Sequence, residues 1–155
     1  MEDSSRPDEP SRSAPRLHDT VRLSAEGIAK VLGDLEARVL RAVWEIGHPV
    51  PARAVHERVI QEHDVALLTV VTVLNKLVDK GLLRREKQAG LLHFEARMAE
   101  AEFRALVTRR VVDGILSLGP AAVAASFVDA LAETNPEQLE ELERLVRERL
   151  HREKA

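Results

Sequence analysis

The sequence predicts a mainly α-helical protein with a small β-wing. Residues 66–95 have the pattern of one helix followed by two short strands, and most other apolar residues from position 34 to 150 recur at helical spacing. Two helices that precede a polar-faced helix and a strand pair form a winged helix-turn-helix. We therefore expect a disordered tail and lead-in at residues 1–32, a winged helix-turn-helix domain at 33–97 and a C-terminal helical dimerisation region at 98–151.

The composition fits such a domain and excludes several classes of protein. Of the 155 residues, 45% are hydrophobic but only 3% are aromatic, so the expected core is aliphatic. The absence of cysteine removes disulfides, thiolate metal sites and cysteine catalysis. No apolar run approaches the roughly 18 residues of a membrane span, and no hydrophobic signal region opens the chain. We expect a cytoplasmic protein that does not insert into a membrane.

Charge is unevenly distributed along the chain. The formal net charge is −3, yet residues 38–110 hold 13 Lys and Arg against 9 Asp and Glu. The flanking segments are acidic, with 5 against 8 in residues 1–37 and 5 against 9 in residues 111–155. A basic centre between acidic ends is compatible with local contact to phosphates.

The first two helices are predicted from their apolar stripes and end signals. The first runs from Asp34, its expected N-cap, to about Ile46, and residues 47–49 (Gly-His-Pro) end it. The second begins near Pro51 and closes at residues 63–64. Its expected inner face is Val55, Val59 and Ile60.

The third helix, from about residue 66 to 80, has two distinct faces. Its apolar stripe is Val70, Val73, Leu74 and Leu77. Gly81 occupies the position at which helices end in the left-handed conformation. The strands that follow are joined by a turn at residues 88–90 (Gln-Ala-Gly) and make the wing.

The polar face of the third helix and the wing carry groups that bind double-stranded DNA. Short hydroxyls and long cations reach base edges and phosphates, and an asparagine can contact adenine. The alternative interpretations are a solvated helix face and an exposed strand that uses charge to prevent edge pairing. The candidate contacts are Thr69, Thr72, Asn75 and Lys76 on the helix, Arg84, Arg85 and Lys87 on the wing, and Arg53 at the start of the second helix.

The C-terminal third predicts three short helices and a homodimer. They cover residues 99–118, residues 121–132 and a segment that starts at Asn135 and Pro136, with Gln138 completing a capping signal. Their apolar stripes are too many to be buried within one short chain, so a second copy is expected to cover them. The candidate interface residues are Phe103, Val107, Val111, Phe127, Leu139, Leu142 and Val146.

No pattern for catalysis, a metal or a cofactor emerges. His56 and His63 are seven residues apart, whereas a helical metal pair usually has a spacing of four. The sequence has no Gly-rich phosphate loop and no nucleophile elbow. We expect a protein that is not an enzyme and binds neither metal nor cofactor.

Three segments together resemble the penicillinase-repressor (BlaI/MecI) family over about residues 32–150. Residues 32–40 with Val43 and Trp44 look like its first helix, and residues 69–74 with 80–83 look like its recognition helix and wing entry. Residues 126–128 and 137–142 resemble its dimerisation end. This chain has Leu68 where many relatives carry a polar residue.

The resemblance implies a homodimeric repressor on a palindromic operator. It also implies a membrane-bound metalloprotease sensor that relieves repression through cleavage at Ser126 and Phe127, where relatives place Asn before the Phe. Two alternatives stay open at this point: a winged-helix regulator that responds to a small molecule, and a winged-helix adaptor that binds proteins and not DNA.

Overall fold

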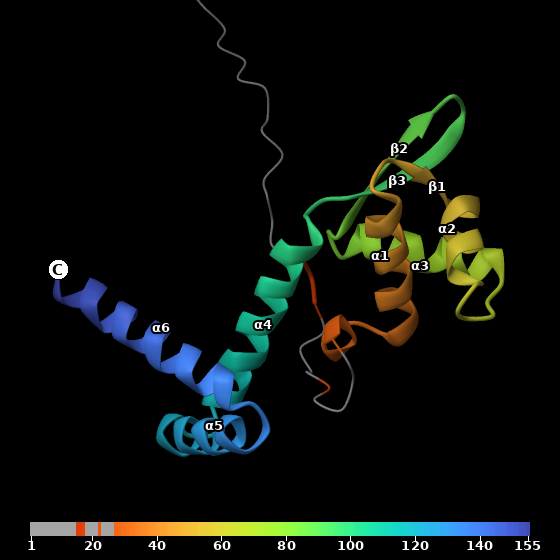
Figure 1. Ribbon diagram of the computed structural model, residues 1–155. Coiled ribbons are helices and arrows are strands. Elements are labelled where there is room, and N and C mark those ends of the chain that lie inside the picture. The colour runs from red at the N-terminus through yellow and green to blue at the C-terminus, as the bar shows by residue number, and fades with distance from the viewer. Residues whose placement is uncertain (1–14, 18–21, 23–26) are drawn as a thin grey trace, which may run out of the picture. The chain divides into compact units, whose positions relative to one another are not determined.

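The computed structural model describes residues 15–17, 22 and 27–155, which pack as two units (Figure 1). The first unit extends to Val107 and the second is Thr108–Ala155. Most of the predicted tail, residues 1–14 and 18–21, lies outside the described residues. The predicted fold class, mainly helical with a small antiparallel sheet, is confirmed.

Three helices form the body of the first unit: α1 (Asp34–Ile46), α2 (Ala52–Val59) and α3 (Leu67–Asp79). The predicted stripe on α3 is buried, with Val70, Leu74 and Leu77 fully enclosed and Val73 nearly so. This stripe lies where α3 packs against α1, α2 and the sheet. At about 25 cal/mol per Å² of apolar surface, each such side chain contributes roughly 1.5–3 kcal/mol to stability.

The wing is a three-stranded antiparallel sheet in the order β1-β3-β2. β2 (Leu83–Gln88) and β3 (Leu91–Ala96) form a hairpin that projects beyond the helices (Figure 1). Ala89 and Gly90 both have positive φ, 49° and 80°, as a two-residue hairpin turn of right-handed twist requires. β1 (Val50–Pro51) was not predicted, because two residues are too few to show alternation; it pairs Val50 with Phe94.

Two details of the first two helices differ from the prediction. Gly33, not Asp34, occupies the N-cap position of α1, and it supplies no side-chain cap. The Asp34 carboxylate instead accepts a hydrogen bond from Arg22 at 3.2 Å. α2 ends at Val59, so Ile60 lies outside the inner face and is 44% exposed.

The lead-in to α1 is part of the first unit. A short 3-10 helix, η1 (Gly27–Lys30), precedes α1, and the side chains of Ile28, Ala29, Val31 and Leu32 are buried. The Arg22 guanidinium donates to the carbonyl oxygens of Ala29 and Leu32 at 2.7 and 2.8 Å. The apolar residues just before the predicted domain start therefore belong to the core of the first unit.

The beginning of α4 (Glu100–Leu116) also packs into the first unit. Phe103 is fully buried, and its ring centroid lies 5.7 Å from that of Trp44 on α1. The Trp44 indole N–H donates to the Met98 carbonyl oxygen at 3.0 Å. The compact unit therefore continues to Val107, ten residues beyond the end at residue 97 that the sequence suggested.

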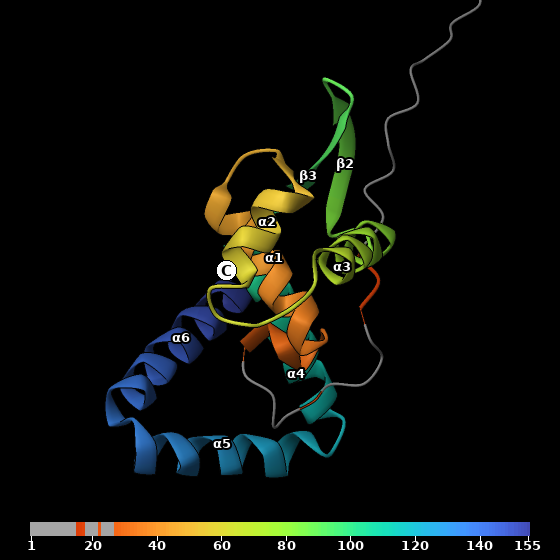
Figure 2. The same cartoon turned by 90° about the vertical axis from the view of Figure 1, so that its right-hand side faces the viewer.

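The second unit consists of the rest of α4, α5 (Pro120–Thr134) and α6 (Pro136–Lys154). α5 and α6 meet at Asn135 and diverge from there (Figure 2). The predicted cap is confirmed, since the Asn135 side chain accepts the Gln138 N–H at 3.4 Å. Within the described chain, α5 and α6 contain no buried residue.

A pair of leucines on α3 tests how this helix is held. Leu77→Ala removes a fully buried side chain, so we expect the free energy of unfolding to fall by about 2–5 kcal/mol. Leu68→Ala, on the same helix, removes a side chain that is 76% exposed and should change it by less than about 0.5 kcal/mol. Urea titration followed by circular dichroism measures both. Equal losses in the two variants would contradict the assigned faces of α3.

Candidate nucleic-acid interface

The outward face of α3 carries most of the predicted contact residues. Thr69, Thr72 and Lys76 are all exposed, on the side of the helix opposite the buried stripe. Leu68 lies at the start of the same face. The face therefore combines two hydroxyls, one cation and one large apolar side chain within about two helical turns.

Two polar side chains of α3 are occupied by bonds within the unit. The Thr72 hydroxyl donates to the Leu68 carbonyl oxygen at 3.0 Å. The Asn75 amide donates to the Val71 carbonyl oxygen at 3.1 Å, and its own oxygen accepts from Arg85 of the wing. Asn75 is half-buried and fastens α3 to β2, a role that its sequence position did not reveal.

The wing separates the three cations that the sequence had grouped. Successive residues of a strand point to opposite faces, so Arg85 and Lys87 share one face and Arg84 lies on the other. Arg85 pairs in register with buried Phe94 and reaches Asn75, which places its face toward α3. Arg84 is opposite Glu95, whose carboxylate accepts from the Arg84 Nε at 2.8 Å.

The Arg84–Glu95 pair could have been found from the sequence by counting. A two-residue turn at residues 89–90 places Gln88 opposite Leu91, and the same register then places Arg84 opposite Glu95. The sequence predicted a three-residue turn at residues 88–90, and a turn of that length does not pair Gln88 with Leu91. The negative charge of a paired carboxylate offsets part of the attraction between an arginine and a phosphate.

Arg53 lies in the first turn of α2 and is exposed. The β1 strand directly before α2 pairs with β3, so the start of α2 is held next to the sheet. Arg53 is therefore brought to the end of α2 that adjoins the wing. The exposed face of α3, Arg85, Lys87 and Arg53 thus belong to one compact unit.

Comparison with known proteins agrees with this architecture. The family model described as penicillinase repressor matches residues 32–148, three quarters of the chain. The chain belongs to the penicillinase-repressor family. The match begins within the buried lead-in before α1 and ends near the end of α6, so it includes both units.

Individual relatives match this chain over only part of its length. The transcriptional regulator BlaI of Mycobacterium tuberculosis is 42% identical over 52 residues, in both strain CDC 1551 / Oshkosh and strain H37Rv. The match covers 34% of this chain and only 38% of the length of those regulators. An uncharacterized 16.5 kDa protein of Latilactobacillus sakei is 27% identical over 109 residues, which are 69% of this chain and 74% of that protein.

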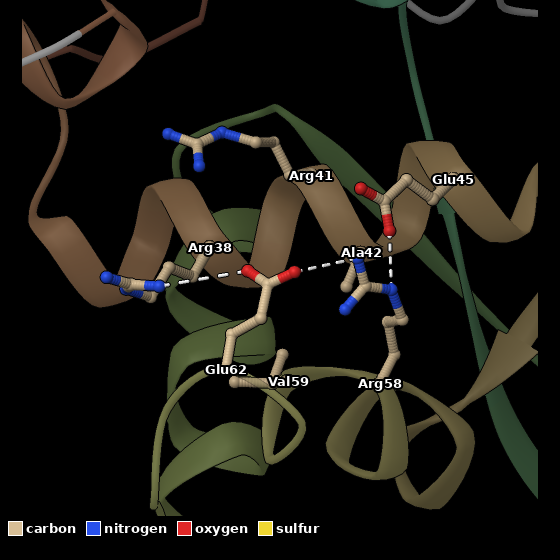
Figure 3. Close-up of a pocket in the computed structure, with 7 residues that line it drawn as sticks. All are labelled: Arg38, Arg41, Ala42, Glu45, Arg58, Val59 and Glu62. Atoms are coloured by element: carbon tan, nitrogen blue, oxygen red, sulfur yellow. Dashed lines mark hydrogen bonds and ion pairs between the residues drawn. The ribbon is translucent and has the colours of Figure 1, made fainter.

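A hollow lies between α1 and α2 in the first unit (Figure 3). Arg58 of α2 is the centre of its charges: its Nε lies 2.7 Å from a Glu45 oxygen of α1, and its Nη2 lies 3.0 Å from Glu62. Hydrogen bonds that Arg58 donates to these two carboxylates, with Glu62 the larger cause, raise the pKa of Arg58. The charges that line the hollow are therefore largely paired with one another and fasten α2 to α1.

The expected dimerisation residues fall into two groups in this family member. Phe103 and Val107 are buried in the first unit and contribute to its core. Phe127 and Val146 are about half exposed, and Val111, Leu139 and Leu142 are partly exposed. Ser126 and Phe127, the expected cleavage position, lie exposed in the middle of α5.

The polar faces of α6 carry ion pairs at helical spacing. Arg144 binds Glu141 at 2.5 Å and also pairs with Glu148, and Arg147 pairs with Glu143 at 2.5 Å. The hydrogen bond from Arg144 lowers the pKa of Glu141, so the ion pair persists to a lower pH than an unpaired glutamate would allow. Such exposed pairs support an isolated helix modestly.

Among residues 15–17, 22 and 27–155, no group of three or more His, Cys, Asp or Glu side chains is arranged to hold a metal ion. In the same part of the chain, no single helix has both the length and the hydropathy to cross a membrane. Helices α4 and α5 meet those criteria only as a pair, which is bent by 119°.

Proposed function

We propose that this protein is a DNA-binding transcriptional repressor in which α3 enters the major groove and the wing contacts the backbone. The observation that carries the proposal is the exposed Thr69–Thr72–Lys76 face of α3 beside Arg85 and Lys87 of the wing. A helix of this kind fits the major groove, and hydroxyls and cations are the groups that contact base edges and phosphates there. Membership of a repressor family and similarity to a named transcriptional regulator support the same function.

We further propose that the protein acts as a homodimer through its second unit. α5 and α6 bury nothing within one chain, and Phe127, Val128, Leu145, Val146 and Leu150 remain exposed. A second copy offers the same apolar residues in return, as a two-fold interface requires. Two winged domains related by two-fold symmetry would read a palindromic operator whose half-sites are spaced by about 34 Å or a multiple of it.

We also propose that the protein acts in the cytoplasm. Repression there is relieved by cleavage at Ser126 and Phe127 after a membrane-bound metalloprotease sensor is activated. Both residues are exposed, and the helix that holds them has no buried residue. A protease binds an extended segment, so the helix has to open locally before cleavage. Local opening of such a helix costs little free energy. Cleavage there would divide the unit that holds the dimer together.

Binding to DNA is tested with the full-length protein and the region upstream of its own gene. We expect a gel shift at about 50 mM salt, where even non-specific complexes are visible. Lys76→Ala should weaken binding to the specific site by about 5–150-fold, because a long cation on the reading face contributes roughly 1–3 kcal/mol. Absence of binding to any duplex at this salt concentration would contradict the proposal and favour a protein-binding adaptor.

The two arginines of the wing make a matched pair of variants. Arg85→Ala removes a cation from the face toward α3, so we expect weaker binding to all sequences and a salt slope, log K against log[salt], reduced in magnitude by about one. Arg84→Ala removes a cation that Glu95 already pairs, so its effect should be clearly smaller. Fluorescence anisotropy between 50 and 200 mM salt measures both slopes. A larger effect of Arg84→Ala would show that the opposite face of the wing contacts the backbone.

Truncation after Val107 tests the proposed dimer. The first unit ends at this residue, and its buried Phe103 is retained. We expect a folded monomer that binds the operator much more weakly, whereas the full chain should sediment at about twice its 17.3 kDa mass. Truncation after residue 97 should destabilise the unit, because Trp44 loses its contact with Phe103. A truncated protein that stays dimeric would move the interface into the first unit.

A further inference from the structure

The reading face of α3 begins with an exposed leucine. Leu68 is the second residue of the helix and 76% exposed, whereas Leu74 and Leu77 of the same helix are fully buried. The neighbours of Leu68 on this face, Thr69 and Thr72, are also exposed. Leu68 is therefore not part of the core, and the surface around it is too polar to form an apolar patch for another protein.

The polar side chains near Leu68 have limited capacity to read bases. The Thr72 hydroxyl donates its hydrogen bond to the Leu68 carbonyl oxygen, so it can accept a hydrogen bond from a base but not donate one in this conformation. Asn75 donates one amide N–H to the Val71 carbonyl oxygen and its side-chain oxygen accepts from Arg85, so bonds within the unit fix the orientation of its amide. Within the described residues, Lys76 is the cation that α3 presents on this face.

The chemistry that matches such a face is a methyl group. In the major groove thymine is the only unmodified base with a methyl group, and apolar side chains and the threonine methyl contact it. The first residues of a recognition helix are those that meet base edges. Leu68 lies in this first turn, and Thr72 follows it by four residues on the same side of the helix.

We propose that Leu68 reads the C5 methyl group of a thymine in each operator half-site, with the Thr72 methyl beside it. The inference rests on the proposed DNA-binding function and specifies it further: Leu68 is a specificity-determining residue, and a thymine is the base it selects. Lys76, further along the helix, supplies the polar contact to a guanine or a phosphate of the same half-site.

The experiment removes the thymine methyl group from the DNA and, separately, the Leu68 side chain from the protein. Full-length protein first selects its preferred duplex from a random library, and each thymine of that duplex is then replaced singly with deoxyuridine. For the wild type we expect about fourfold weaker binding at one thymine of each half-site, which corresponds to about 0.8 kcal/mol for one methyl group removed from water. Leu68→Ala should bind the thymine duplex more weakly and no longer distinguish thymine from uracil at that position.

Ile60→Ala is the matched control, because Ile60 is an exposed apolar residue of the same unit that lies outside α3. It should keep the full thymine-to-uracil ratio. If the wild type binds its duplex but no uracil weakens binding, the methyl contact is wrong while DNA binding stands. If Leu68→Ala keeps the discrimination, another residue reads the methyl group and the assignment to Leu68 is wrong. If no duplex is selected at all, the proposed function itself fails, and the methyl contact fails with it.

Discussion

Burial of one stripe of α3 determines the arrangement of the first unit. The stripe that faces α1, α2 and the sheet consists of Val70, Val73, Leu74 and Leu77. Its burial sets the rotation of α3 about its own axis and therefore which side chains of α3 are exposed. The outer face is consequently the one on which Leu68 lies. Because a helix has a fixed 3.6-residue period, turning any other residue outward would expose part of the apolar stripe, at a cost of kilocalories per side chain.

The two units differ in how much apolar surface they bury within one chain. The first uses its own residues, including the lead-in before α1 and Phe103 from the start of α4, to complete a core around Trp44 and the sheet. The second has helices without a buried residue, and its stability as a single chain depends on helix capping at Asn135 and on exposed ion pairs along α6. Exposed ion pairs contribute little to stability, so we expect the second unit to be stably folded only when the proposed dimer forms.

Elements with a clear period or end signal were predictable from the sequence. The limits of α1, the buried stripe of α3, the left-handed Gly81 and the Asn135 cap follow from local rules and agree with the structure. Features that depend on distant partners were not predictable. The β1 strand exists only because β3 lies beside it, and α2 stops short of its apolar pattern, so that Ile60 is exposed.

The candidate contact surface shows the same division. The sequence by itself determined that α3 has a polar face and that cations follow it in the wing, because both are statements about spacing along one chain. Only the tertiary structure decided which of those groups are available: Arg84 is turned to Glu95, Asn75 is held by Arg85, and Leu68 stands exposed. The physical reason is that hydrogen-bond partners and burial depend on residues brought together across the fold, whereas helical and strand periods act between near neighbours.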